Sequence, residues 1–483
     1  MARLAPLAVS MMLALLLGLA PTAPAPAAAQ ITTPDLATVT SRLEGEVDKI
    51  LRETGIPAIS IALVRDGEVV WTGAFGYANV AARVPASTET YFSTGSTFKF
   101  VTATAIMQLV EKGELDLDTP LNEFVGPELA VEGADDVTFR HMLSHHSGLE
   151  LEGPVGIVPL WSRLAPRTPL ELLEGTTRTG PPGEEYRYCN ECYGIMAWVV
   201  EKASGRIYDE YVAEYILQPL GTDIASASVP TPAMIEHMAL PYDLQDNAAV
   251  PVQQVRYDVF AAGDIYLRPA DMARFLAAQL SGGVYGNKRI LSEASTEEMR
   301  RRQFDGQNYG LGIGMAEFNG HAIISHGGAI PGFNSIMIGE PVTGHGVYIM
   351  SNSGQSAKAI SPLARYAMQL MWGDDPEPLP SFASVERIEV EVSPELFDEY
   401  VGEYAITPEF VMSVTRVGNR FFVQATGQGR LEVFAESDTD FFLTAVEASV
   451  TFGRDEDGGP VTHLVLHQGG ANQRAERLPD SGR

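Results

Sequence analysis

Ser96 and Lys99 are the residues of this chain whose types and spacing suggest covalent chemistry. They stand in Ser96-Thr-Phe-Lys99, the one Ser-x-x-Lys of the sequence, and this spacing places both side chains on one face of a helix. A serine hydroxyl needs an adjacent base to attack an acyl carbon, and a lysine becomes such a base when burial lowers its pKa from about 10.4. The pair therefore predicts acyl transfer through Ser96. The alternative is a helix-capping serine followed by a solvated lysine.

The residues that follow Ser96 predict the element that carries it. Apolar side chains recur at helical spacing, at Phe98, Val101, Ile106, Leu109 and Val110. We therefore expect a buried helix that opens at Ser96 and stops before Gly113. Because Lys99 enters this apolar helix instead of flanking it, the catalytic interpretation is favoured over the solvated one.

Composition places the chain among globular proteins and excludes some partners. Its 483 residues, 45% of them hydrophobic, suit two or three domains with sizeable cores. The formal net charge of −29 argues against binding to nucleic acid or to an anionic membrane surface. The acidic residues are spread along the chain, which is typical of a solubilising surface.

The N-terminus has the pattern of an export signal. Arg3 precedes an apolar run at 8–20, and a Pro/Ala stretch ends in Ala27-Ala-Ala29. We expect residues 1–29 to be a cleavable signal peptide, a mature chain that begins at Gln30, and a periplasmic or secreted location. The apolar run falls short of the roughly 20 residues of a spanning helix, so no membrane span is expected after cleavage.

The rest of the chain predicts an α+β catalytic domain over residues 30–375. Two β-rich runs flank the turn at Asp66-Gly67 and predict a hairpin before the Ser96 helix. Further strands are expected near the C-terminal end of the domain, at 321–328, 333–339 and 346–351. Strands at both ends with helices between them predict one antiparallel sheet flanked by helices.

A second domain is expected after a Pro-rich linker. The linker covers residues 376–383 and contains Pro376-Glu-Pro-Leu-Pro380. Beyond it, residues 384–483 hold short β-rich runs separated by Gly, Asn and Asp turns. This pattern predicts a small antiparallel β domain, a barrel or a sandwich.

Two further groups of residues could take part in disulfide formation or metal binding. Cys189 and Cys192 are the only cysteines, and in an exported chain they could be two buried thiols or one tight disulfide. His141, His145 and His146 could share a metal ion, but no further ligands of matching character stand near them. A His-Ser-Gly turn that ends a helix is the favoured interpretation, and no metal or cofactor is expected.

Three motifs in order connect the chain to a known family. Ser96-Thr-Phe-Lys99 is followed by Tyr188-Cys-Asn190 and then by His326-Gly-Gly328. This order resembles the serine β-lactamase and DD-peptidase superfamily, in particular the class C-like group of penicillin-binding proteins, esterases and D-amino-acid peptidases. A second Tyr-x-Asn, Tyr77-Ala-Asn79, precedes the serine and is interpreted as a decoy.

The resemblance implies a role for each catalytic residue. Ser96 would attack the acyl carbon, while Lys99 and the Tyr188 phenol would take its proton and return one to the leaving group. Asn190 would donate to the amide oxygen of the substrate and to Lys99. Cys189 would point to the back of the site, toward Cys192.

The resemblance also assigns the strand that lines the site. The backbone N–H groups of Ser96 and Ala329 would hold the oxyanion, and Gly327 and Gly328 would let the strand approach the ligand. At His326 many β-lactamases have lysine, which pairs with a substrate carboxylate. A histidine with an ordinary pKa near ~6.5 would bind that carboxylate more tightly as the pH falls toward 6.

These residues predict an exported serine hydrolase that forms an acyl-Ser96 intermediate. Esters, amides or D-amino-acid peptides are the expected small-molecule or peptide substrates, as in DD-carboxypeptidases and esterases. One alternative is a β-lactamase that hydrolyses antibiotics, and another is a catalytically silent penicillin-binding or scaffolding module. The oligomeric state does not follow from the sequence.

Overall fold

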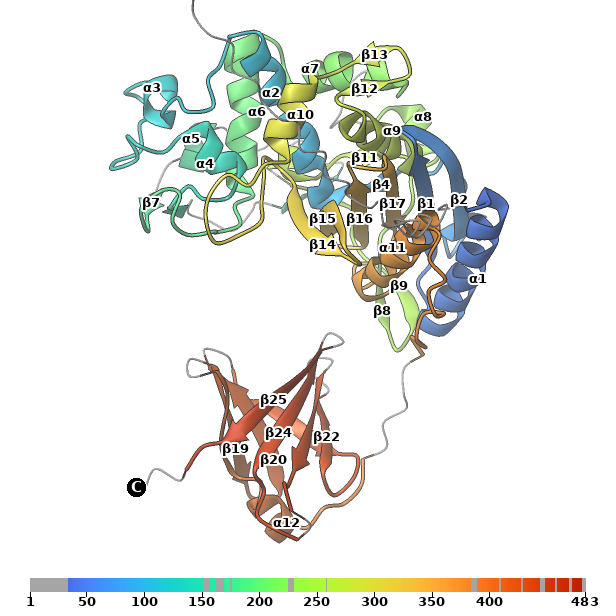
Figure 1. Ribbon diagram of the computed structural model, residues 1–483, viewed down its shortest axis with the longest axis vertical. Coiled ribbons are helices and arrows are strands. Elements are labelled where there is room, and N and C mark those ends of the chain that lie inside the picture. Colours follow the sequence, from blue (N-terminus) through green and yellow to red (C-terminus); the bar gives the residue numbers. More distant parts are fainter. Residues whose placement is uncertain are drawn as a thin grey trace, which may run out of the picture.

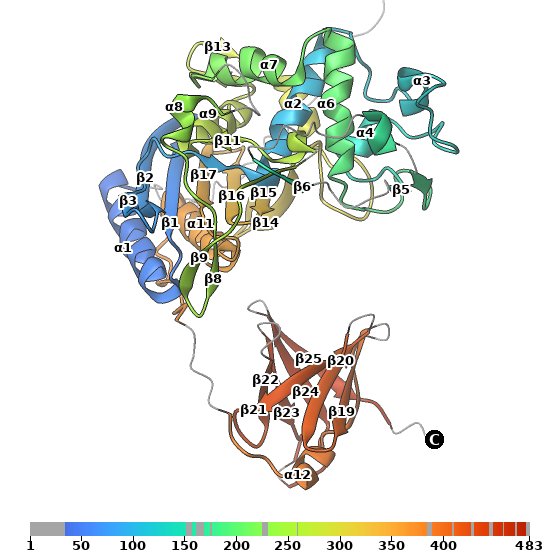
Figure 2. The same cartoon turned by 180° about the vertical axis from the view of Figure 1, so that it is seen from behind.

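The computed structural model describes residues 34–479, apart from 151–156, 161–168, 174–175, 225–229, 258, 384–388, 408–409, 427–428, 444–447, 457 and 469–470. The signal peptide expected over 1–29 lies outside the described residues. Two bodies follow one another along the chain, a larger one of helices around a sheet and a smaller one of strands (Figures 1 and 2).

A seven-stranded antiparallel sheet is the centre of the larger body, and both ends of the domain contribute to it. In spatial order its strands are β14 (Gly314–Phe318), β15 (His321–Ile330), β16 (Phe333–Glu340), β17 (His345–Ser351), β1 (Ala58–Arg65), β2 (Glu68–Asn79) and β3 (Val84–Pro85). The hairpin predicted at Asp66-Gly67 joins β1 to β2, with Arg65 paired to Glu68. The predicted α+β fold with an antiparallel sheet is confirmed.

Both faces of this sheet are covered, which explains why β1 is buried from Ala58 to Val64 and apolar there except for Ser60. Ile59, Ile61 and Leu63 face one core, with α1 (Leu36–Thr54) and α11 (Ala357–Trp372). Ala62 and Val64 face the other core, with α9 (Pro269–Leu280) and α2 (Lys99–Glu111). Alternate residues of one strand therefore hold two helical layers together.

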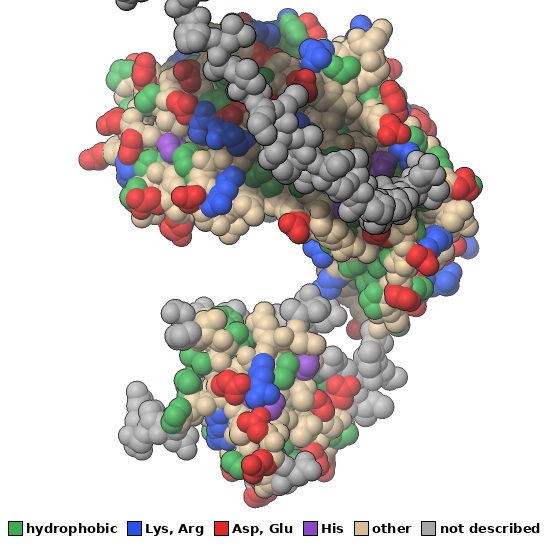
Figure 3. All heavy atoms as spheres, viewed as in Figure 1, with side chains coloured by type: hydrophobic (Ala, Val, Ile, Leu, Met, Phe, Trp, Pro, Cys, Tyr) green, Lys and Arg blue, Asp and Glu red, His purple; other side chains and the backbone are tan. Residues whose placement is uncertain are grey.

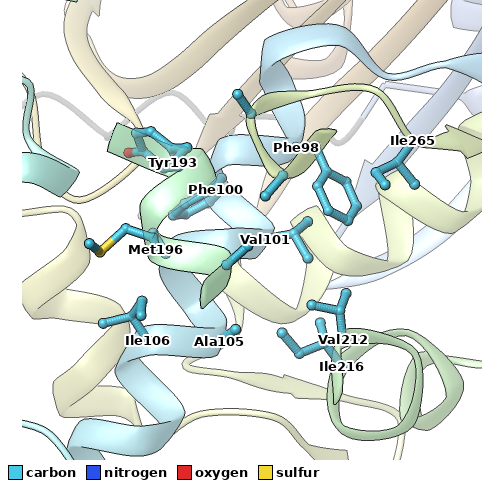
Figure 4. Close-up of a cluster of buried hydrophobic side chains, with 14 of the residues drawn as sticks. Phe98, Phe100, Val101, Ala105, Ile106, Tyr193, Met196, Val212, Ile216 and Ile265 are labelled. Atoms are coloured by element: carbon cyan, nitrogen blue, oxygen red, sulfur yellow. The ribbon is translucent and has the colours of Figure 1, made fainter. Parts of the chain in front are cut away.

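Helix α2 is the central helix of the second layer, and it is buried on all sides from Lys99 to Leu109. Figure 4 shows Phe100, Val101 and Ile106 among side chains from its neighbours, with Tyr193 and Met196 on α6 (Glu191–Ser204). The 3₁₀ turn η1 (Gly95–Phe98) precedes it, so Ser96 lies in this turn instead of opening the α-helix itself. Gly113 follows the helix with a φ of 72°, as its predicted end requires.

Shorter elements complete the larger body. The helices are α3 (Leu121–Val125), α4 (Phe139–Leu143), α5 (Pro169–Leu173), α7 (Tyr208–Val212), α8 (Pro232–Ile235) and α10 (Glu293–Met299), with the turns η2 (Ala213–Leu217), η3 (Gln218–Leu220) and η4 (Phe260–Ala262). The strand pairs are β4 (Phe92–Ser93) with β11 (Tyr266–Leu267), β5 (Leu149–Glu150) with β7 (Thr177–Arg178), β6 (Ile157–Pro159) with β10 (Val255–Tyr257), β8 (Tyr242–Gln245) with β9 (Ala248–Pro251), and β12 (Val284–Tyr285) with β13 (Lys288–Arg289). No helix within the described ranges is both long and apolar enough to cross a membrane.

The smaller body is a closed eight-stranded antiparallel barrel. Its strands are β18 (Gly402–Thr407), β19 (Phe410–Val417), β20 (Arg420–Ala425), β21 (Leu431–Ala435), β22 (Asp440–Leu443), β23 (Ala448–Gly453), β24 (His463–Gln468) and β25 (Ala471–Arg477). Phe397 of α12 (Pro394–Asp398) enters its core and stacks on Phe421 at a centroid distance of 3.9 Å. The predicted C-terminal antiparallel β fold is confirmed as a barrel.

Acidic side chains are scattered over the visible face of both bodies and do not gather in one patch (Figure 3). This distribution agrees with the interpretation of the net charge as a solubilising surface.

The residues expected to form a linker pack against α1. Arg42 donates to the carbonyl oxygen of Pro376 at 2.7 Å, Lys49 donates to the carbonyl oxygen of Leu379, and the Glu53 carboxylate accepts from the backbone N–H of Phe382 at 2.7 Å. Leu379 and Phe382 also join the core between the sheet, α1 and α11. This segment therefore contributes to the larger body.

We predict that a chain ending at Ala383 unfolds cooperatively without the barrel, because it keeps every contact of this segment with α1. A chain ending at Gly373 lacks those contacts and should melt several degrees lower, since it loses buried apolar area. Thermal denaturation followed by circular dichroism compares the two. Loss of cooperative unfolding in the longer truncation would show that the barrel and the larger body share a core.

Candidate functional site

The turn that carries Ser96 is held by close approach of three backbone segments. Gly95 has a φ of 52°, and a Cβ there would lie 2.8 Å from the backbone nitrogen of Ala329. A Cβ on Gly263 would lie 2.7 Å from the backbone nitrogen of Ser96, and one on Gly328 would lie 3.0 Å from it. Glycine at these three positions lets η1, β15 and the loop after η4 meet around Ser96.

Lys99 begins α2 and is completely buried. Its Nζ lies 3.1 Å from Ser96 Oγ, 2.7 Å from Asn190 Oδ1 and 2.8 Å from the carbonyl oxygen of Ala262. Burial lowers the pKa of Lys99 well below its ordinary value, while the charge of Glu191 raises it in part.

This set of partners suits an uncharged amine. A neutral lysine has two hydrogens and one lone pair, and the oxygens of Asn190 and Ala262 accept those two hydrogens. The lone pair then faces the Ser96 hydroxyl, whose proton it can take. This geometry allows Lys99 to act as a base for Ser96. Asn190 Oδ1 accepts a hydrogen bond from Lys99, which differs from the expectation that Asn190 donates to Lys99.

Tyr188 forms the opposite wall of the reacting centre. Its ring centroid lies 4.8 Å from Lys99 Nζ, and its hydroxyl hydrogen-bonds Ser96. Burial of the hydroxyl raises the pKa of Tyr188 above its ordinary value although 42% of the residue is exposed, and the bond to Ser96 lowers that pKa in part. The phenol keeps its proton at neutral pH, so Tyr188 has a proton that it can donate.

A disulfide fixes the segment that carries Tyr188 and Asn190. Cys189 and Cys192 are bonded to each other, which decides between the two states that the sequence leaves open. Both cysteines are buried, and the backbone N–H of Cys192 donates to Cys189 Sγ at 3.0 Å. The bridge closes the first turn of α6 immediately behind the two site residues.

His145 supports the same segment, in a way that sequence reasoning missed. Its Nδ1 accepts the backbone N–H of Cys189 at 3.0 Å, and its ring stacks on Tyr188 with centroids 4.3 Å apart. Burial holds the pKa of His145 well below its ordinary value, so the ring stays neutral. No local sequence pattern predicts this contact, because His145 and Cys189 are 44 residues apart in the sequence.

The three histidines considered as metal ligands serve separate contacts. Nδ1 of His141 interacts with Thr138 Oγ1 at 2.8 Å, and Nδ1 of His146 interacts with the carbonyl oxygen of Ser144 at 2.7 Å. Over the described part of the chain, no group of three His, Cys, Asp or Glu side chains is arranged to hold a metal ion. These histidines lie on and after α4, in the turn that ends it.

The two glycines of β15 differ in what surrounds them. A Cβ on Gly328 would lie 2.3 Å from Ser335 Oγ and 2.4 Å from the carbonyl oxygen of Thr94, so only glycine fits there. A Cβ on Gly327 would have its nearest neighbour at 4.0 Å. Packing within the protein therefore requires glycine at Gly328 and not at Gly327. The expectation that both glycines let the strand approach a ligand stays a prediction.

His326 is engaged inside the protein. Its Nε2 lies 2.9 Å from the Tyr309 hydroxyl, and its Nδ1 lies 2.6 Å from the carbonyl oxygen of Gly327. Burial and the charge of Lys99 lower the pKa of His326 to about 4. The expectation that the ring becomes charged near pH 6 is wrong, because desolvation keeps it neutral at that pH. A contact between His326 and a substrate carboxylate stays a prediction.

A cavity of about 170 Å³ opens beside Ser96. Its wall includes Asn190 and Ala329, which places the expected oxyanion donors and the Asn190 amide around one space. The remaining lining residues are Tyr257, Val259, Ala262, Gly263, Asp264 and Ile330. The structure thus brings Ser96, Lys99, Asn190 and Ala329 together as the sequence predicts. Sequence reasoning did not identify the remaining lining residues named above as part of the site.

The decoy motif lies elsewhere. Tyr77 is on β2, next to the edge strand β3, where it pairs with Pro85, and 39% of it is exposed. The backbone N–H of Ala82 donates to Asn79 Oδ1 within a turn. Neither residue lines the cavity beside Ser96.

Comparison with known proteins agrees with this geometry. The family model "Beta-lactamase" matches residues 43–370, and the chain belongs to this family of serine hydrolases. A second model, "Domain of unknown function (DUF3471)", matches residues 386–477, which hold the barrel.

Relatives and solved structures include penicillin-binding proteins and an amidase. Penicillin-binding protein 4* of Bacillus subtilis is 26% identical over 86% of this chain and 94% of its own length. The octameric penicillin-binding protein homologue from Pyrococcus abyssi is 25% identical, with a TM-score of 0.60, over 90% of this chain and all of that one. The D-amino acid amidase from Ochrobactrum anthropi, complexed with L-phenylalanine, is 25% identical, with a TM-score of 0.56, over 69% of this chain and 99% of that one.

Tyr188→Phe should lower the turnover of phenylalanine p-nitroanilide by a factor on the order of 100, because the leaving anilide nitrogen must take a proton and the variant lacks the group proposed to donate it. Tyr77→Phe is the matched control and should keep nearly full turnover, since this tyrosine lies outside the site. Steady-state kinetics on both purified variants measures the effect. A loss at Tyr77 with none at Tyr188 would reverse the assignment of the two Tyr-x-Asn motifs.

Proposed function

We propose that this protein is an exported hydrolase that cleaves amide or ester bonds through an acyl-Ser96 intermediate. The contact of a buried Lys99 with Ser96 carries the proposal, because it supplies a neutral base at the hydroxyl that must react. The expected signal at residues 1–29 supports a periplasmic or secreted location.

The reaction would begin with attack of Ser96 Oγ on the acyl carbon, while its proton moves to Lys99 Nζ. The carbonyl oxygen becomes an oxyanion, and the backbone N–H groups of Ser96 and Ala329, two residues of the cavity wall, are its proposed donors. Tyr188 gives its proton to the leaving nitrogen or oxygen as that bond breaks, and Lys99 restores the proton of the phenol. Water then attacks the acyl-enzyme by the same route in reverse.

D-amino-acid peptides, amides and esters are the proposed substrates. The relatives named as penicillin-binding proteins and the solved D-amino acid amidase support this class. The uncharged His326 supports it as well, because a neutral imidazole already bonded to Tyr309 offers a substrate carboxylate less than a lysine would. Efficient hydrolysis of β-lactam antibiotics is correspondingly disfavoured.

A fluorescent fluorophosphonate should label the wild-type protein at Ser96, and Ser96→Ala should remove the label because the nucleophile is gone. Peptide mass spectrometry locates the adduct. A panel of p-nitrophenyl esters, D-alanyl peptides and a chromogenic cephalosporin then defines the substrate, and we expect the cephalosporin to be the poorest of the three.

Two outcomes would contradict the proposal. A folded wild-type protein that resists both the fluorophosphonate and a fluorescent penicillin would be a silent module. Turnover of the cephalosporin above that of esters and D-alanyl peptides would assign the site to a β-lactamase.

A further inference from the structure

Asp264 is a buried acid on the wall of the cavity beside Ser96, and the mechanism above does not use it. Only 4% of the residue is exposed. Its Oδ2 accepts the backbone N–H of Tyr257 at 2.8 Å, whereas its Oδ1 is buried and has no hydrogen-bond partner among the described residues. A buried acceptor without a partner is costly, so a ligand group that donates a hydrogen bond to this oxygen would be favoured.

The cavity lies on the acyl side of the nucleophile. It is lined by Ser96, Asn190 and Ala329, while Tyr188, the donor to the leaving group, is absent from its wall. An acyl group attached to Ser96 would therefore extend into this space, toward Asp264. Its other side chains include Val259 and Ile330, and among the described residues that line it Asp264 is the one charged group.

We propose that Asp264 binds a free ammonium group on the acyl portion of the substrate, so that the enzyme prefers amino-acid amides, esters or peptides with an unblocked amino group. Asp264 Oδ2 keeps its hydrogen bond from the backbone N–H of Tyr257, and Asp264 Oδ1 accepts a hydrogen bond from the ammonium group. This assignment rests on the proposed acyl-Ser96 chemistry and specifies its substrate class. A purely structural Asp264 would only hold β10 to the loop that precedes β11.

The charges around Asp264 define how this preference depends on pH. Desolvation raises the pKa of Asp264 to about 7, while the N–H of Tyr257 and the charge of Arg256 lower it in part. Tyr257 and Arg256 on β10 and Tyr266 on β11 are the titratable groups that interact with it. Asp264 is charged above about pH 7, and an α-ammonium group loses its charge above about 8. The preference for substrates with a free amino group should therefore be greatest between about pH 7 and 8 and should fall at lower and at higher pH.

The test compares phenylalanine p-nitroanilide with its N-acetyl derivative, in both enantiomers. We expect wild-type kcat/KM to favour the free amine, and Asp264→Asn to lower it for the free amine by about 10- to 100-fold, the value of a hydrogen bond to a charged group. The N-acetyl substrate should change little, because the asparagine still accepts the N–H of Tyr257. Asp243→Asn on β8 is the matched control and should alter neither substrate.

Parallel losses on both substrates would show a structural role and overturn the proposal. A wild-type preference for the N-acetyl substrate would overturn the proposal without any variant. So would a ratio of the kcat/KM values for the two substrates that does not vary between pH 6 and 9. Labelling of Ser96 by the fluorophosphonate distinguishes failure of the ammonium site from failure of the proposed hydrolase function. A labelled enzyme without amine preference rejects the ammonium site alone, whereas an unlabelled one rejects the hydrolase.

Discussion

The burial of one lysine amine is the constraint on which the rest of the site depends. Lys99 is the first residue of a helix enclosed on all sides, and water does not reach its Nζ. A charged amine there would lack its hydration, so the neutral form is favoured and the lone pair faces Ser96. The oxygens of Asn190 and Ala262 orient the amine, which fixes where the base acts. The helix core therefore does more than stabilise the fold, because it also lowers the pKa of the amine that we propose as the base.

The sheet and the helical layer meet at Ser96, and glycine makes this contact possible. Gly95, Gly263 and Gly328 come from three separate segments, and a Cβ on any of them would collide with backbone around the nucleophile. The β15 strand can therefore place Ala329 on the cavity wall beside Ser96. Behind the site, His145 and the disulfide of Cys189 hold the segment with Tyr188 and Asn190. Each reactive group is thus positioned by an element that has little freedom to move.

The sequence predicted those helices, strands and turns that local residue patterns encode. The hairpin of β1 and β2, the three strands β15, β16 and β17, the helix after Ser96 and the β-rich C-terminal region all follow from periodicity and turn residues. The short strand β14 and the helix α11 were missed, since β14 follows an irregular segment and α11 contains Pro362. The environment of His326 could not be predicted, because its pKa depends on Tyr309, Lys99 and burial, which only the folded chain brings together. Asp264 was missed for the same reason, as nothing next to it in the sequence distinguishes a buried acid from an exposed one.

Titration of Lys99 in the folded protein tests the central claim most directly. Lysine labelled with ¹³C at the ε carbon reports the charge of each amine by NMR, and the resonance lost in Lys99→Arg identifies the one at the site. The account predicts a midpoint well below the ordinary value of about 10.4, with the amine neutral at the pH of catalysis. A midpoint at or above that ordinary value would mean that Lys99 is an ammonium ion beside Ser96, and it could not then be the base that activates the serine.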